Sequence, residues 1–588
     1  MYFPNRTRNY DKSPVIEIKG YSDSAWRGYE AIAGELKRKI HALRQKKAVL
    51  TIDFYHGVRH AEVEQGLIRR LSADRIFFVE EAKLPEHVLY PKLKRNITDD
   101  RVFGVLSVHK LGEFFDQEKI EAMRKAIDAA EEGLVVVYGI GAALVTKGDV
   151  LVYADMARWE IQQRFRSKEL DNWGAKNFGE DTLRKYKRAF FIEWRVLDRH
   201  KRGLFKDMDY VLDTNAKDDP KMITGEAFRG AMEQIVRRPF RLVPYFDEGV
   251  WGGRWLEEVC GLERKKDNYA WGFDGVPEEN SLYLKFGGIT VEIPSIDLVF
   301  LKPKELLGPK VYARFGHEFP IRFDFLDTMD GGNLSLQVHP LTEYIQEEFG
   351  MHYTQDESYY IMDAGEGASV YLGVKNGVDP GEMIAALERA QREGGTFDDE
   401  KYVNKFPVKK HDHISIPAGT VHCSGKNAMV LEISATPYIF TFKLWDWGRV
   451  GLDGIPRPVH IHHGKHVIQF DRNTDWVKEH LLNRTERVAA GDGWIEERTG
   501  LHELEFIETR RHWFSKPVRH TTEGVFHMLN LVEGEEAVVE SPSGAFEPFV
   551  VHYAETFIVP ARVSEYVIRP YGKSEGKTIA TIKAYVRT

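Results

Sequence analysis

The pattern of apolar and polar residues changes near residue 238, and this change limits the architecture of the chain more than any other feature. Before it, apolar runs alternate with amphipathic helices: the run "KAVLTIDFY" follows a helix predicted over residues 29–45, and "LVVVYGIGAALV" follows one over residues 120–133. This alternation is typical of a parallel sheet with helices on both faces. After it, short strands with Gly, Pro and Asp turns predominate, apart from a helix predicted over residues 380–393. Such a pattern favours a β-barrel or sandwich.

The length of 588 residues exceeds what one hydrophobic core can organise, so the chain is predicted to be multidomain. We expect an α/β parallel-sheet domain over residues 1–237, a barrel over 238–462 and a second barrel over 463–588. The stretches "HISIPAGTVHCSG" and "TFIVPARVSEYVI" share a strand, a Pro-Ala turn and a second strand. Their similarity indicates two related barrels.

Composition limits the partners and the compartment. The net charge is −8 and no basic stripe could follow a phosphate backbone, so nucleic acid is not expected to bind. No apolar run is long enough to span a membrane, and the first residues lack the apolar core of a signal peptide. The two cysteines, Cys260 and Cys423, are too few for a disulfide framework, and neither lies in a CxxC motif. We therefore expect a cytoplasmic protein without membrane contacts or a thiolate metal site.

Four polar side chains in the middle of the chain could bind a metal. Gln337 and His339 are two residues apart in a short strand, so they lie on one face. Glu357 opens another strand, and His422 follows the turn "IPAGT". This mixture of imidazole, carboxylate and amide donors suits a divalent cation such as zinc.

Other histidines compete for the same role. The chain has 22, and a single strand histidine is more often hydrogen-bonded in the core or on the surface than bound to a metal. The clusters "HDH" at residues 411–413 and "HIHH" at residues 460–463 are interpreted as solvated histidines or as neighbours of ligands.

Several motifs between Pro244 and His462 occur together in one known family. They are "FDEGVWGGRWL", "LSLQVHP", "DESYYIMDA", "YLGV", "IPAGTVH", "VLEIS" and "KLWDWGR". In this combination the chain resembles the type I mannose-6-phosphate isomerase (phosphomannose isomerase) family. The resemblance implies a double cupin fold and one zinc ion per chain. It also implies an enediol(ate)-forming reaction that interconverts mannose 6-phosphate and fructose 6-phosphate.

The resemblance also implies roles for particular residues. The zinc ligands would be Gln337, His339, Glu357 and His422. Arg449 and Arg457 match two arginines of the family and would be cationic catalytic residues, while the base that moves the proton is left open.

Some positions depart from the family. Asp324 and Gln355 replace lysines, Lys443 replaces an arginine, and Leu341 and Thr342 follow the motif QVHP, where the family has two aspartates. A buried phosphate dianion needs compensating charge, so these changes weaken the case for a phosphorylated substrate. The alternative is a metal-containing carbohydrate-binding or regulatory protein without isomerase activity. A phosphorylated sugar or a related carbohydrate is the expected ligand.

The first domain resembles uridine-kinase-type nucleoside kinases, but its phosphate loop is degenerate. Where such loops have several glycines, Lys and Ser or Thr, this chain has one glycine, Gly57, followed by His60, Ala61 and Glu62. We predict a kinase-like P-loop scaffold that no longer transfers phosphate. The glycine pair in "YGIGAAL" is interpreted as a strand-end turn. The cations Arg195, Arg199 and Lys201 stand where the lid of such a kinase would supply cations, but they are interpreted as a solvated helix face.

The second barrel is predicted to hold no metal. Glu565 stands at the position equivalent to His422, and His527 has no Gln or His two residues away. One imidazole and one carboxylate are too few donors to hold zinc.

Overall fold

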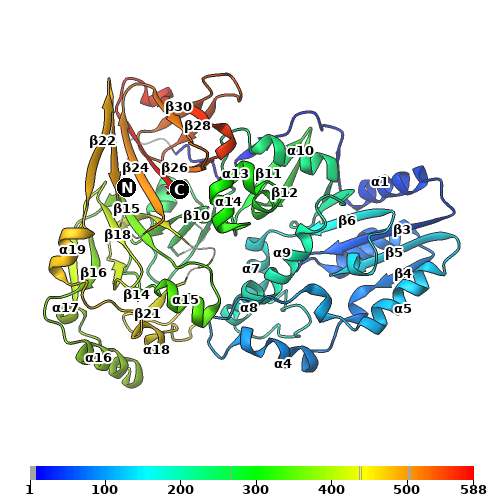
Figure 1. Cartoon of the computed structure of the whole chain (residues 1–588), viewed down its shortest axis with the longest axis horizontal. Helices are drawn as coiled ribbons and strands as arrows, with labels where there is room; N and C mark the ends of the chain where they lie inside the picture. Colours follow the sequence, from blue (N-terminus) through cyan, green and yellow to red (C-terminus); the bar gives the residue numbers. More distant parts are fainter. Residues whose placement is uncertain (1–7, 265–266, 436–437, 439, 501–504) are drawn as a thin grey trace. The chain divides into compact units, whose positions relative to one another are not determined.

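The computed structural model describes residues 8–588 except 265–266, 436–437, 439 and 501–504. Within them the chain is multidomain and mostly β-sheet, as predicted. It divides into two compact units (Figure 1). The α/β unit comprises Val15–Gln234 and Ser281–Leu301, and the β unit comprises Met1–Pro14, Ile235–Asn280 and Lys302–Thr588. The boundaries expected after residues 237 and 462 remain predictions.

The α/β unit is built on a seven-stranded sheet with a parallel centre. Its strands, in order across the sheet, are β2 (Ala25–Arg27), β8 (Lys221–Thr224), β7 (Tyr210–Asp213), β6 (Val150–Asp155), β3 (Lys47–Phe54), β5 (Gly133–Gly139) and β4 (Arg75–Phe78). The strands from β7 to β4 are parallel, and β8 and β2 are antiparallel to their neighbours. Every residue of β3 after the first is buried, which explains its continuous apolar run.

The strand order reverses at β3. The next strand along the chain, β4, lies on one side of β3 beyond β5, whereas β6 and β7 lie on the other side. In open parallel sheets, ligands bind at the carboxyl ends of the strands near such a point. Helices flank the sheet (Figure 1), among them α1 (Tyr29–Ala42), α5 (Gln117–Asp128), α7 (Arg158–Arg166) and α9 (Arg195–Arg202).

A later segment of the chain returns to this unit. A small sheet contains β1 (Val15–Glu17), β11 (Ser281–Phe286) and β12 (Ile289–Pro294), and helix α12 (Ile296–Leu301) follows it. β1 and β11 are parallel neighbours although more than 250 residues separate them.

The β-unit strands up to β21 form a six-stranded and a five-stranded sheet, and we refer to this part as the first barrel. The six-stranded sheet has the order β18 (His413–Ile416), β15 (Glu357–Ala364), β20 (Ala428–Ser434), β13 (Arg322–Asp327), β10 (Trp271–Gly275) and β9 (Tyr245–Asp247). The five-stranded sheet has the order β17 (Val403–Pro407), β16 (Ser369–Val374), β19 (His422–Ser424), β14 (Leu336–Val338) and β21 (Phe442–Trp445). The helix predicted over residues 380–393 is confirmed as α16 (Pro380–Glu393).

The second barrel also contains two sheets. The larger has the order β22 (Thr485–Gly491), β23 (Trp494–Thr499), β24 (Ile507–Phe514), β31 (Ile579–Val586), β26 (His527–Glu533) and β29 (Thr556–Val559). The smaller has the order β25 (Val518–Thr521), β30 (Glu565–Pro570), β27 (Glu536–Glu540) and β28 (Phe549–His552). Apolar side chains of both sheets, including Phe514, Leu531 and Ile568, form one buried cluster between them.

No helix in the described part of the chain combines the length and the apolar composition required to cross a bilayer.

Candidate metal centre

Strand pairing in the first barrel aligns polar side chains in two rows. In the five-stranded sheet, His422 and Lys443 lie directly opposite Gln337 on its two sides. In the six-stranded sheet, Glu357 and Arg322 both lie opposite Ser434 of β20. Because residues opposite one another in a sheet point to the same face, each row presents its side chains together.

Side chains from both sheets converge on the carboxylate of Glu357. Its carboxylate lies 3.0 Å from Nε2 of His339 through one oxygen and 2.9 Å from Nε2 of His422 through the other. The amide end of Gln337 is 3.3 Å from His422 Nε2. All four side chains are buried. The structure therefore brings the four predicted metal ligands together.

The remaining imidazole nitrogens fix the orientation of both rings. Nδ1 of His339 is 3.1 Å from the carbonyl oxygen of Phe440, and Nδ1 of His422 is 2.8 Å from that of Thr420. A carbonyl oxygen accepts only, so each Nδ1 carries the proton and each Nε2 keeps its lone pair. This arrangement is typical of metal-binding histidines.

The turn before His422 is held by close packing. Gly419 has a φ of +88°, and a Cβ at this position would lie 2.6 Å from Cγ of Gln469. Its backbone N–H donates to the carbonyl oxygen of His339 at 2.9 Å. The glycine thus allows the turn to approach the segment 337–339, which carries two other ligands in and directly after β14.

The donor set fits a metal ion. Donor atoms at zinc distances of 2.0–2.1 Å in a tetrahedron are about 3.3 Å apart, close to the separations found between these side chains. Neither His339 Nε2 nor Glu357 Oε1 has a well-formed hydrogen bond to another described residue. Burial opposes ionisation of Glu357, but the two imidazoles hold its pKa well below the ordinary value. Burial lowers the pKa of His422 despite the nearby carboxylate, so the ring is neutral and able to coordinate.

A second row of polar side chains lies on the six-stranded sheet, two residues along the strands from the row that contains Glu357. Asp324 and Tyr359 lie opposite Glu432 on either side, on the face that carries Glu357. Burial raises the pKa of Asp324 to about 6, although Arg322 opposes this shift. Burial, Asp324 and Glu357 raise the pKa of Glu432 well above its ordinary value.

Arg322 is a buried cation that the sequence reasoning missed. Its Nε donates to Asp324 at 3.0 Å, and both of its terminal nitrogens are buried without a hydrogen-bond partner among the described residues. It precedes Asp324 by two residues, so both side chains lie on the same strand face. Arg322 lies two residues before Asp324, which departs from the family. Charged residues two positions from each such departure are the sequence signal that identifies it.

The residues that stand where the family has lysines or an arginine differ in their contacts. The Gln355 amide donates to Glu357 at 2.9 Å and accepts from the Phe440 N–H at 2.7 Å. It therefore supports a ligand but supplies no charge. Lys443 remains a cation in the row of Gln337.

The two predicted catalytic arginines share one carboxylate. Arg449 and Arg457 both pair with Asp446. Arg449 also donates to the carbonyl oxygen of Asn333 at 2.7 Å, and Arg457 lies 3.5 Å from the hydroxyl of Ser335. Both cations are therefore placed at the entry to β14 rather than in contact with Glu357.

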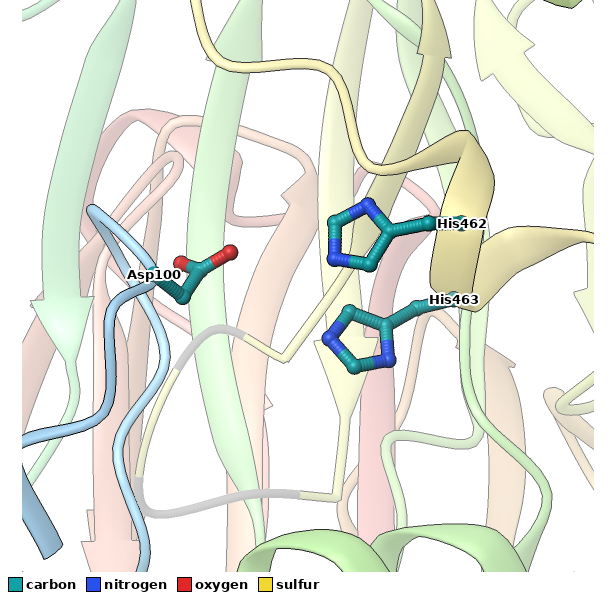
Figure 2. A group of neighbouring side chains, drawn as sticks. All are labelled: Asp100, His462 and His463. Carbon is teal, nitrogen blue, oxygen red and sulfur yellow. The ribbon is translucent and has the colours of Figure 1, made fainter. Parts of the chain in front are cut away.

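The alternative histidine clusters have other partners. His413 is fully buried between hydroxyls of Thr499 and Ser358, at 2.8 and 2.9 Å, and burial lowers its pKa to about 3. The interpretation of His413 as solvated is therefore wrong. His462 and His463 lie on α18 (Ile461–Gly464) with ring centres 4.2 Å apart (Figure 2). Asp100 in the same view belongs to the α/β unit, and we assign no site to this group.

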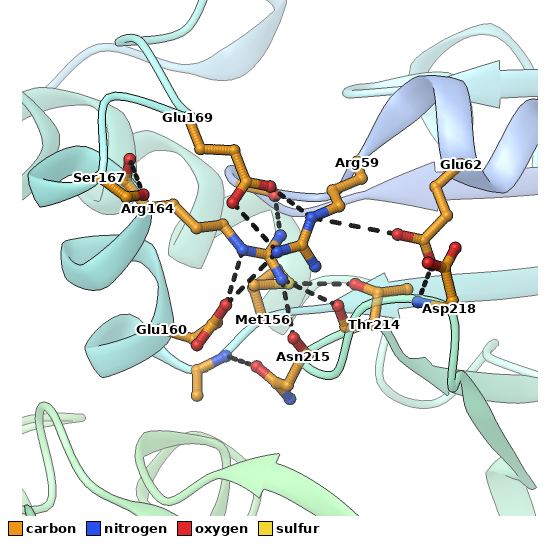
Figure 3. Close-up of polar contacts among 12 residues, drawn as sticks. Arg59, Glu62, Met156, Glu160, Arg164, Ser167, Glu169, Thr214, Asn215 and Asp218 are labelled. Carbon is orange, nitrogen blue, oxygen red and sulfur yellow. Dashed lines mark hydrogen bonds and ion pairs between the residues drawn. The ribbon is translucent and has the colours of Figure 1, made fainter.

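Side chains of the loop after β3 pair with residues of α7 and of the segments that follow α7 and β7 (Figure 3). Arg59 donates to Glu169 at 3.2 Å and Arg164 donates to Glu160 at 2.9 Å. Glu62 accepts from the N–H of Asp218 at 3.0 Å. A Cβ on Gly57 would lie 2.9 Å from Ile161 of α7, so this glycine accommodates the helix.

The cations on α9 are not a solvated helix face, and this interpretation is wrong. Lys201 is 1% exposed and contacts both Asp155 and Asp297. Arg199 donates to the carbonyl oxygens of Ser107 and His109, at 3.0 and 2.6 Å. The periodicity of the helix could not reveal these contacts, because the partners come from distant segments.

The two residues discussed for the second barrel have separate partners. His527 Nδ1 lies 2.7 Å from the hydroxyl of Tyr566, and Glu565 pairs with Arg519. The prediction that this barrel holds no metal stays a prediction.

Comparison with known sequences gives two results. Residues 28–237 match the profile of a family described as a domain of unknown function, DUF8485. Mannose-6-phosphate isomerase of Streptococcus mutans is 28% identical over 260 residues, which are 43% of this chain and 76% of that protein. Mannose-6-phosphate isomerase ManA of Bacillus subtilis is 23% identical over 351 residues, which are 58% of this chain and 96% of that protein. The C-terminal part is thus homologous to mannose-6-phosphate isomerases, which are enzymes.

Solved structures are similar over about three-fifths of the chain. The Bacillus subtilis mannose 6-phosphate isomerase aligns with a TM-score of 0.48 and 19% identity over 59% of this chain and 99% of that one. A putative mannosephosphate isomerase from Archaeoglobus fulgidus aligns with a TM-score of 0.44 and 16% identity over 60% of this chain and 98% of that one.

Proposed function

We propose that the chain is a zinc-dependent aldose–ketose isomerase that interconverts mannose 6-phosphate and fructose 6-phosphate. The observation that supports this most is the convergence of His339, Glu357 and His422 in a sequence homologous to mannose-6-phosphate isomerases. Gln337 would be the fourth protein ligand of one zinc ion per chain. Imidazole, carboxylate and amide donors suit this ion.

The reaction requires removal of a proton from a carbon next to a carbonyl and stabilisation of the resulting enediol(ate). When bound, zinc would supply Lewis-acid chemistry at the sugar oxygens. Lys443 and Arg322, one in each polar row, would donate to oxygens where negative charge develops. Asp324 and Glu432, in the second row of the six-stranded sheet, would hold or move the proton at their carboxyl oxygens.

The phosphate group of the substrate needs a cation of its own. Arg449 and Arg457 together carry one more positive charge than the Asp446 carboxylate that they share, so they could hold an anion at the entry to β14. Arg322 compensates for the lysine replaced by Asp324, because its side chain leaves from the same strand face two residues earlier. These cations counter the argument that the departures from the family weaken the case for a phosphorylated substrate.

The test is an isomerase assay of the metal-loaded full-length protein with mannose 6-phosphate and fructose 6-phosphate. We expect interconversion, and we expect the double variant Arg322→Met, Asp324→Asn to lower kcat/KM by about a hundredfold, the loss typical when a buried donor to a developing charge is removed. The double change removes both members of the ion pair, so the carboxylate that Arg322 contacts at 3.0 Å is not left without its cation. Arg392→Met, on the exposed face of α16, is the control. No turnover in either direction by the wild type would contradict the proposal.

A carbohydrate-binding protein without turnover is the second candidate. The observation that favours it is Gln355, whose amide is engaged by Glu357 and Phe440 and supplies no charge. Binding of mannose 6-phosphate without product formation would support this candidate over the first.

We further infer that the α/β unit is a kinase-derived scaffold without kinase activity. The strand-switch point at β3 supports the scaffold, and the salt bridges that occupy the loop argue against phosphate binding. Calorimetric titration of the full-length protein with Mg-ATP is expected to give no heat of specific binding at protein concentrations near 50 μM. A saturable heat with a Kd below about 10 μM would show that the loop is misinterpreted.

The cellular location that we infer is the cytoplasm. Cys260 and Cys423 are both buried as free thiols, which agrees with a reducing compartment. A phosphorylated sugar is the partner that we infer, and neither nucleic acid nor a membrane is expected.

A further inference from the structure

A cavity of about 500 Å³ lies in the second barrel, apart from the residues of the metal centre. Polar side chains predominate in its lining, among them His512, His520, His527, Arg510, Lys583 and Tyr585. This volume falls within the range of cavities that hold small ligands. None of these residues is used in the isomerase proposed for the first barrel.

The barrel interior changes from apolar to polar along its strands. On β24 the side chains of one face change from Phe514 to His512 and Arg510. On the neighbouring strand β31 they change from Ile579 to Lys583. Since alternate residues of a strand share a face, one end of the barrel is an apolar core and the other is a polar cavity.

Two buried imidazoles in this cavity have unused nitrogens. His520 is 4% exposed, and its Nε2 has no hydrogen-bond partner among the described residues. His512 is 2% exposed, and the same holds for its Nδ1. His520 stacks on Tyr566 with ring centres 4.9 Å apart, so its orientation is fixed. Buried polar atoms are normally satisfied, and both of these rings, each with one unsatisfied nitrogen, belong to the lining of the cavity.

The charge of the lining favours an anion. Arg519 pairs with Glu565, which is not part of the lining. The other cations still outnumber the carboxylates: the cations are Lys310, Arg510, Lys583 and Arg587, and the carboxylates are Glu496, Glu508 and Glu523. Lys583 is 7% exposed, and the nearest carboxylate oxygen, on Glu496, is 4.0 Å away and also contacts His512. Burial lowers the pKa of Lys583 to about 8, so the ammonium is still the main form at neutral pH.

A metal ion is a poorer occupant. Burial and the Lys583 charge lower the pKa values of His520 and His527, and the same ammonium would repel a cation placed between them. Neutral imidazoles and a phenol offer donors and acceptors in turn, which suits hydroxyl groups.

We propose that this cavity binds a small polyhydroxylated anion, either a sugar phosphate or a sugar acid. Lys583 faces the anionic group, and His512, His520 and Tyr585 hydrogen-bond to the hydroxyls. The site is independent of the activity proposed for the first barrel.

Calorimetric titration of the full-length protein with glucose 6-phosphate, gluconate, inorganic phosphate and neutral glucose tests this proposal. Glucose 6-phosphate or gluconate should bind at least tenfold more tightly than either inorganic phosphate or glucose, and which of the two binds identifies the anionic group. Lys583→Met and His520→Phe should each weaken this binding at least tenfold. Lys577→Met, an exposed lysine of the same barrel, should leave it within twofold.

Two control measurements show whether binding occurs in this cavity and whether the variants are folded. Binding should persist in His422→Ala, which alters only the first barrel. Circular dichroism and melting temperatures show whether Lys583→Met and His520→Phe are folded. The proposal is overturned if neither anion binds, if inorganic phosphate binds as tightly as both, if both cavity variants bind like the wild type, or if binding disappears in His422→Ala.

Discussion

The variant His422→Ala is expected to purify without bound metal and to lose at least about a thousandfold in isomerase kcat/KM. Its Nε2 lies 2.9 Å from Glu357, and its Nδ1–H is held by the Thr420 carbonyl, so no neighbouring nitrogen can take its place. Loss of a metal that stabilises charge by several kcal/mol corresponds to three or more powers of ten in rate. His339→Ala is expected to behave in the same way.

Elemental analysis of the purified proteins measures this effect directly. The matched control is His462→Ala, because His462 belongs to the competing cluster on α18 and its side chain is exposed. We expect about one metal ion per chain in the wild type and in the control, and less than about a tenth of an ion in the two ligand variants. Full metal content in both ligand variants, or loss of metal in the control, would show that the ion is bound elsewhere.

The four candidate ligands could be predicted from the sequence because part of their geometry is local and because the motifs that contain them resemble those of a known family. Two of them are separated by one residue of a strand, and His422 follows a turn whose glycine is recognisable. Arg322 was missed for a related reason: the replacement of a lysine by Asp324 was considered alone, without the charge two residues earlier on the same face.

The polar cavity of the second barrel was missed because the sequence was searched for a metal-ligand pattern. His512, His520 and His527 lie on three different strands, so no short motif contains them. The alternation from Phe514 to His512 and from Ile579 to Lys583 was visible, but its meaning depends on both strands lining the same interior. Strand pairing between distant segments supplies that information, and local sequence does not.

The parallel sheet of the α/β unit could be predicted from alternating apolar runs and helices, but the return of Ser281–Leu301 to that unit could not. This segment follows strands that belong to the β unit, and its own short strands look like those around them. Its residue Asp297 makes an ion pair that explains why Lys201 is buried, which no periodicity of α9 could show.

That ion pair leads to the second large effect: Lys201→Met is expected to destabilise the α/β unit by about 3–5 kcal/mol. Nζ of Lys201 lies 3.0 and 3.1 Å from the two oxygens of Asp155 and 2.6 Å from Asp297, and all three side chains are at most 2% exposed. Burial opposes the ammonium, but the carboxylates raise the pKa of Lys201 above its ordinary value. Its stabilising contribution is therefore fully present at neutral pH and is lost only as the pH rises through this raised pKa.

Thermal and urea unfolding measure the effect, which for a unit of this size corresponds to a drop of about 6–20 °C in its Tm. Lys206→Met, an exposed lysine that follows α9, is the control and should change stability by less than about 0.5 kcal/mol. The double variant Lys201→Met, Asp155→Asn removes one of the two carboxylates left without a cation, and Asn can still accept the Met156 N–H bond of 2.9 Å. Burial raises the pKa of the other carboxyl, Asp297, well above its ordinary value, so the neutral form of that group is favoured. The double variant should therefore recover most of the lost stability. A single variant as stable as the wild type, or a double variant less stable than the single one, would mean that the buried charge of Lys201 does not hold these segments together.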